Sequence, residues 1–97
     1  MRRAVIQAAW IQAAEVPLAN ADGCAAVLEL ALHLRGRSNP NAASDLSCAF
    51  YLALAGLKGC IANVEINLPA IKDENVKAKL SDHMQTLIQT SKDQTWE

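Results

Sequence analysis

The feature that most constrains the fold is a long apolar run from Leu46 to Ile71. Its hydrophobic residues recur every three or four positions, which is the spacing of one face of an α-helix. They are Leu46, Phe50, Ala53, Leu57, Cys60 or Ile61, Val64 and Leu68. The strict alternation of a half-buried strand is missing. The pattern predicts one long helix from about Ser44 to Leu68, about 37 Å in length at 1.5 Å per residue.

A second face of this predicted helix carries small residues and two amides: Ala49, Gly56, Gly59, Asn63 and Asn67. A glycine inside a helix costs about 1 kcal/mol relative to alanine. We therefore expect a neighbouring helix to pack very close to Gly56 and Gly59. An unpaired buried amide costs ~1–3 kcal/mol, so the two asparagines are expected either to bond across a helix–helix contact or to line a polar pocket.

The segment before the apolar run reads as a polar turn. Gly36 is a typical stop for the preceding helix, and Pro40 restricts the backbone of the loop. Ser44 or Asn41 is predicted to cap the next helix. Asp45 then lies in its first turn, where the helix dipole favours a carboxylate.

The first third of the chain has high helix propensity on both sides of Pro17. That proline either kinks one long helix or lies in the first turn of a second one. From Leu18 to Leu34 the apolar residues form two adjacent stripes, which predicts a helix covered on more than one side. Asp22, Glu29 and His33 fall together on its remaining edge.

The last third of the chain predicts an amphipathic helix that starts after Asp73, a plausible N-cap, and continues to about Ser91. Its predicted stripe consists of Val76, Leu80, Met84 or His83, Leu87 and Ile88. Residues 92–97 are expected to fray. The sequence thus predicts an all-α fold, an antiparallel bundle of about four helices with one long central helix, in which residues 1–97 form a single domain.

Composition excludes several classes of function. Hydrophobic residues make up 52% of the chain and aromatic residues only 4%, so the core depends on close packing of small side chains. A net charge of −1 argues against a nucleic-acid partner. Lys58, Asn63, Glu65 and Asn67 make a membrane-spanning role for the apolar run expensive.

Side chains capable of catalysis are sparse. Cys24, Cys48 and Cys60 lack a metal-type spacing and are interpreted as buried reduced thiols, which suits a cytoplasmic protein. No phosphate-binding loop, paired-histidine zinc motif or nucleophile motif occurs. His33 and His83 are interpreted as surface or boundary residues, and Glu15 as a solvated charge beside Pro17.

Three segments taken together resemble the formiminotransferase-cyclodeaminase family. They are Ala-Glu-Val-Pro-Leu at 14–18, Asn-Pro-Asn-Ala-Ala-Ser-Asp at 39–45, and Asn-Val-Glu-Ile-Asn-Leu at 63–68 followed by Asp73. More narrowly, the chain is similar to the second half of the cyclodeaminase, or methenyltetrahydrofolate cyclohydrolase, domain. The resemblance implies an all-helical fold, dimers or larger oligomers, and a tetrahydrofolate derivative as substrate without a prosthetic group or metal.

The resemblance also implies roles for individual residues. Asp45 matches the position of a catalytic acid or base, or of a carboxylate that holds a cationic nitrogen of the substrate. Four residues match the substrate-binding positions that would line the folate pocket: Asn41, Ser44, Asn63 and Asn67.

The chain also departs from the family pattern. It lacks the Pro-Gly-Gly-Gly-Ser type segment of the family's first half, and Ser38 stands where a glycine is common. A non-catalytic helical self-association module is therefore the alternative function. Because half a domain leaves apolar faces bare, we expect a homodimer or larger oligomer in either case.

Overall fold

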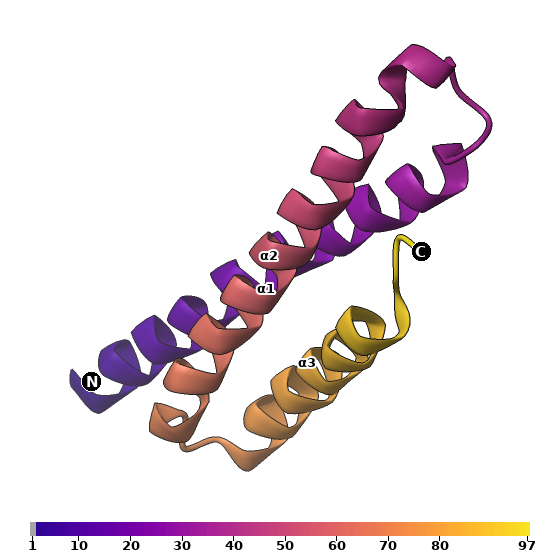
Figure 1. Ribbon diagram of the computed structural model, residues 1–97. Helices are drawn as coiled ribbons and strands as arrows, with labels where there is room; N and C mark the ends of the chain where they lie inside the picture. Colours follow the sequence, from indigo (N-terminus) through magenta and orange to yellow (C-terminus); the bar gives the residue numbers. More distant parts are fainter. Residues whose placement is uncertain (1) are drawn as a thin grey trace.

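The computed structural model describes residues 2–97, which form three α-helices (Figure 1). Helix α1 spans Arg2–Leu34, α2 spans Ala43–Asn67 and α3 spans Glu74–Asp93. Two short 3-10 helices, Pro40–Ala42 and Leu68–Ala70, lie in the connections. The all-α class is confirmed. The predicted number of about four helices is not, because α1 continues without interruption through Pro17.

Helices α1 and α2 form a long hairpin, and α3 lies along one side of it (Figure 1). The chain turns back after α1 at Gly36, whose φ of +78° is a conformation that glycine adopts without strain. The α3 helix packs on the middle of α1, between about Ile11 and Ala25, and on the C-terminal half of α2. The hairpin therefore has one side that packs on α3 and one side that does not.

The core consists of two clusters along the hairpin. The larger one joins all three helices, with fully buried residues such as Ala14, Leu57 and Val64, and includes Leu80 of α3. The predicted apolar stripes of α2 and α3 are largely confirmed, because buried residues recur along them at helical spacing. The smaller cluster lies nearer the turn, and Phe50 is its largest buried side chain.

The C-terminal segment contributes to the smaller cluster. The Trp96 ring lies 5.5 Å from the Phe50 ring, centroid to centroid, and the Arg35 guanidinium lies 5.3 Å from the Trp96 centroid. The prediction that residues 92–97 fray is therefore wrong. Packing a large aromatic ring and a cation–π contact offset the entropy of ordering the chain end.

The cap predicted for the start of α3 is present, but the caps predicted for the start of α2 are not. Asp73 caps α3 as predicted, since its carboxylate accepts from the backbone N–H groups of Asn75 and Val76 at 3.0 and 3.2 Å. Neither Ser44 nor Asn41 caps α2. The 3-10 helix Pro40–Ala42 leads directly into α2 and satisfies its first N–H groups with backbone carbonyls.

The predicted close approach of two helices occurs at Gly56. A Cβ atom built there would lie 2.9 Å from the Cys24 sulfur of α1, closer than real contacts allow. At Gly59, a Cβ atom would meet no atom within 4 Å in the described part of the chain. Cys24 and Cys60 are half-buried, but Cys48 is exposed, so its predicted burial is wrong. Cys48 lies on the side of α2 that faces away from the core.

Helix α1 passes through Pro17 because α2 replaces the hydrogen bond that proline removes. Pro17 has no N–H to donate to the carbonyl of Ala13, four residues earlier. The Asn67 side chain donates to that carbonyl instead, with Nδ2 3.1 Å from the Ala13 oxygen. The asparagines were predicted either to bond across a helix–helix contact or to line a polar pocket. Asn67 bonds across a helix–helix contact.

Replacing Asn67 by alanine should lower the free energy of unfolding by about 1 kcal/mol, because the Ala13 carbonyl loses its donor. In a Pro17→Ala background the loss should shrink, since residue 17 then supplies an N–H to the same carbonyl. Urea denaturation of the parent chain, the two single variants and the double variant should give a coupling free energy between positions 17 and 67 of about 0.5–1 kcal/mol. An equal loss in both backgrounds would contradict this role, and Asn63→Ala at an exposed position is the matched control.

Candidate functional site

The predicted site residues fall into two groups at opposite ends of α2. Asn41, Ser44 and Asp45 lie together at the turn, and all three are exposed. The backbone N–H of Asn41 donates to the side chain of Asn39 at 3.0 Å, which fixes the start of the 3-10 helix. The Asp45 carboxylate is in the first turn of α2, as predicted.

The second group consists of Asn63 and Asn67 near the C-terminal end of α2. The Asn67 amide donates to the Ala13 carbonyl and also to the Asn63 carbonyl, at 3.1 and 2.9 Å. Its donor atom is thereby used inside the chain, and its Oδ1 atom is what it can offer to a ligand. Asn63 is exposed, and among residues 2–97 its side chain has no hydrogen-bonding partner.

Within one chain these two groups do not meet. Asp45 and Asn63 are 18 positions apart on one helix, which is five turns and about 27 Å. Asn67 is one further turn away, about 33 Å from Asp45 along the axis. Because 18 residues make a whole number of turns, Asp45 and Asn63 nevertheless share one face of α2. Their roles in binding and catalysis stay predictions.

Two hollows lie near these groups, although none of the five candidate residues lines them. A cavity of about 200 Å³ at the turn is lined by residues that include Ser38, Asn39 and Trp96. A more open hollow of about 410 Å³ lies along α1 and is lined by Ala9, Gln12, Ala13, Val16 and Pro17. Ala13 accepts the bond from Asn67, but neither asparagine is among the residues that line this hollow. The cavity at the turn is likewise lined by neighbours of Asn41, Ser44 and Asp45 and not by these three residues.

A pair of hydrogen bonds that the sequence did not reveal joins α1 to the connection between α2 and α3. Gln7 of α1 donates through Nε2 to the Ala70 carbonyl at 3.2 Å and accepts through Oε1 from the Lys72 N–H at 2.9 Å. One amide thus holds both sides of the connection between α2 and α3. No local signal marks Gln7, because its partners lie more than 60 residues away in the sequence.

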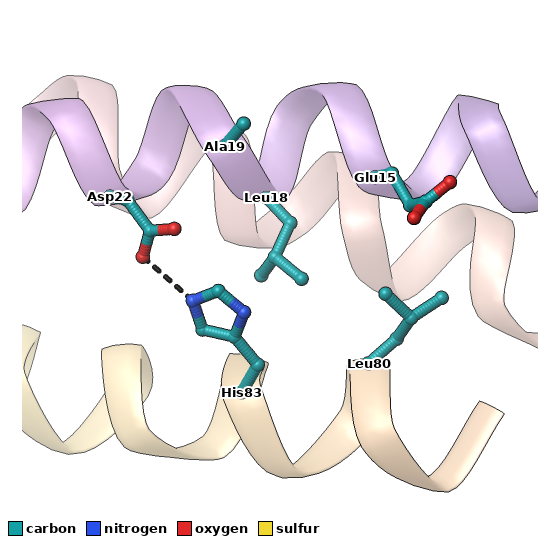
Figure 2. A pocket seen from close by; sticks show the side chains of 6 residues that line it. All are labelled: Glu15, Leu18, Ala19, Asp22, Leu80 and His83. Atoms are coloured by element: carbon teal, nitrogen blue, oxygen red, sulfur yellow. Dashed lines mark hydrogen bonds and ion pairs between the residues drawn. The ribbon is translucent and has the colours of Figure 1, made fainter. Parts of the chain in front are cut away.

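Sequence reasoning also missed a pair of titratable groups that joins α1 to α3 (Figure 2). His83 Nε2 lies 2.7 Å from an Asp22 carboxylate oxygen, beside a hollow of about 290 Å³. Glu15 lines the same hollow, but its carboxylate points away from the imidazole (Figure 2). The side chains of His83 and Asp22 are 44% and 49% exposed. They therefore form a solvent-exposed contact between α1 and α3, which contributes about 1 kcal/mol at most to stability.

The described chain, residues 2–97, brings no three His, Cys, Asp or Glu side chains together in a way that could hold a metal ion.

Burial raises the pKa of the Cys60 thiol, and the neighbouring Cys24 thiol raises it further. The thiolate of Cys60 should thus form at higher pH in the folded chain than in the unfolded one. Its alkylation by iodoacetamide, followed by mass spectrometry from pH 7 to 10, should reach half its maximal rate at higher pH when folded than in concentrated urea. Identical profiles in both states would contradict this environment.

Comparison with known proteins gives two matches. The family model described as formiminotransferase-cyclodeaminase matches residues 1–86. A methenyltetrahydrofolate cyclohydrolase of Methylorubrum extorquens (strain AM1) is 38% identical over 72 residues, which cover 74% of this chain and 35% of that protein. The chain thus spans about a third of the length of the curated relative it matches. No solved structure matches it significantly.

Proposed function

Because this chain belongs to the formiminotransferase-cyclodeaminase family, we propose that it acts on one-carbon units carried by tetrahydrofolate, as a methenyltetrahydrofolate cyclohydrolase. The observation that carries the choice is the 38% identity to a cyclohydrolase. A formiminotetrahydrofolate cyclodeaminase, which closes the same ring with loss of ammonia, is the related alternative. On this proposal the substrate is a folate and no prosthetic group is required.

The reaction suits the residues at the two ends of α2. The methenyl carbon lies between two nitrogens that share a positive charge. Water adds to that carbon and loses a proton, which leaves a hydroxyl group on it. The hydroxyl then loses its proton as the bond from the carbon to N5 breaks and N5 takes up a proton, and a formyl group is left on N10. A carboxylate such as Asp45 can stabilise the cation and accept the proton from water.

The asparagines of α2 would position the substrate. Asn63 offers both an amide donor and an acceptor, whereas Asn67 offers its Oδ1 atom because its donor is bound to Ala13. Asn41 and Ser44 lie beside Asp45 and supply polar groups at the other end of the helix. Fixed hydrogen bonds of this kind accelerate a reaction by holding the reacting atoms in register.

Asp45→Asn should reduce kcat/KM for methenyltetrahydrofolate hydrolysis at least about 100-fold, because it removes the proton acceptor. Since Asp45 is exposed, the melting temperature should change little. Asp82→Asn on the exposed side of α3 is the control and should keep full turnover. Unchanged turnover in Asp45→Asn would remove this carboxylate from the mechanism.

The alternative function is a non-catalytic helical module, and the distance of about 27 Å between Asp45 and Asn63 within one chain favours it. Folate binding separates the two functions. A saturating folate such as 5-formyltetrahydrofolate, at 100 times its Kd, should stabilise the native chain by about 2.7 kcal/mol and raise Tm. A Tm that stays constant up to millimolar folate would support the module and contradict the enzyme.

A further inference from the structure

Two of the three cysteines lie on neighbouring helices and have no part in the proposed function. Cys24 of α1 and Cys60 of α2 are both half-buried and both pack against the larger core cluster, whereas Cys48 is exposed. Two thiols can be oxidised to a disulfide only if their sulfur atoms can reach bonding distance. The register of α1 against α2 therefore decides what this pair can do.

Two independent contacts fix that register. The Asn67 amide donates to the Ala13 carbonyl at 3.1 Å, which places residue 13 about level with residue 67. The two helices are antiparallel (Figure 1), so residue 24 should be about level with residue 56. The Cys24 sulfur is the atom that a Cβ at Gly56 would meet, at 2.9 Å, which agrees with this register. Cys60 is then one turn of α2, about 6 Å along the axis, from the level of Cys24.

The direction of the two side chains closes this offset. In an α-helix each Cα–Cβ bond leans toward the N-terminus of the helix. Cys24 leans toward lower residue numbers of α1, which in an antiparallel pair is toward the level of Cys60. Cys60 leans toward residue 56, which is toward the level of Cys24. The side chains thus lean toward each other, and Gly56, which has no side chain, lets the two helices come close at this point.

The ionisation of Cys60 agrees with this geometry. Burial raises the pKa of the Cys60 thiol, and the neighbouring Cys24 thiol raises it further. One thiol affects the ionisation of another only at short range. The two sulfur atoms are therefore neighbours in the folded chain.

The pair lies on the side of α1 that is turned away from α3. Asp22 faces α3, because its carboxylate lies 2.7 Å from His83. Cys24 is two residues further along, and two residues turn a helix by about 200°, so its side chain lies on nearly the opposite side. A small soluble oxidant can therefore reach the half-buried sulfur atoms without displacing α3.

We propose that Cys24 and Cys60 form a reversible disulfide bond that crosslinks α1 to α2 when the protein meets a low-molecular-weight disulfide as oxidant. The step is thiol–disulfide exchange. One cysteine thiolate attacks a sulfur atom of the oxidant, which forms a mixed disulfide and releases one thiol. The second cysteine then attacks the sulfur of the first and releases the second thiol. Two protein thiols are oxidised, one disulfide is reduced, and the two protons end on the released thiols.

The crosslink has a consequence for stability. It joins the two limbs of the hairpin and removes unfolded conformations in which they separate. The Tm of the oxidised chain should therefore lie at least about 5 °C above that of the reduced chain. In a reducing compartment the thiols stay free, so the crosslink responds to the redox state of the surroundings. It involves none of the candidate folate-binding residues and goes beyond the proposed function.

The test uses the Cys48→Ser chain, because the exposed Cys48 would otherwise pair between molecules. Incubation with oxidised glutathione at mildly alkaline pH should give a chain lighter by two hydrogen atoms in mass spectrometry. Its tryptic peptides 4–35 and 59–72, which carry Cys24 and Cys60, should be found joined. The rate should not depend on protein concentration, and dithiothreitol should reverse the reaction.

A relocated thiol is the matched control. In the same Cys48→Ser chain, Cys60→Ala combined with Asn63→Cys moves the second thiol to two turns, about 10 Å, from the level of Cys24. Position 63 is exposed, so this chain should fold. The same incubation should leave it with glutathione attached and without an internal disulfide.

Three results overturn the proposal. The Cys24–Cys60 chain could end with two free thiols or with two attached glutathiones, which would show that the sulfur atoms do not reach each other. The relocated pair could close equally readily, which would show that the register is not the cause. The disulfide could form without raising Tm, which would contradict the crosslink as a stabilising contact. All three are measured without substrate, so an inactive chain contradicts the proposed function and leaves this test unchanged.

Discussion

The continuity of α1 through Pro17 is the constraint on which the rest of the structure depends. Proline leaves the Ala13 carbonyl without its helical donor, and the Asn67 amide of α2 fills that position. Because α1 stays whole, the chain forms one long hairpin and not a compact bundle of four shorter helices. Helix α3 then covers only part of one side of this hairpin (Figure 1).

Periodicity and capping rules predicted most of the individual helices. The spacing of Leu57, Val64 and Leu80 identified core positions, and Asp73 marked the start of α3. The features that were missed all depend on contacts between distant segments. Whether Pro17 ends a helix is decided by Asn67, and whether the chain end is ordered is decided by Phe50, so neither outcome is present in the local sequence.

The residues of the candidate site could be predicted from the sequence, but their arrangement in space could not. Resemblance identified Asp45 and the two asparagines, and the predicted length of α2 already implied that they are far apart. What sequence reasoning did not provide was the side of the hairpin that α3 covers, because that depends on contacts between distant segments.

The distance between two labels on α1, one on each side of Pro17, tests this account most directly. Ala9 and Val27 are exposed, so nitroxide labels can be attached to cysteines placed there once Cys24, Cys48 and Cys60 are replaced by alanine. An uninterrupted helix places these two positions five turns apart, so pulsed EPR should give a single narrow distance of roughly 27 Å. A broad distribution centred below roughly 20 Å, as a helix that ends at Pro17 would give, would contradict it.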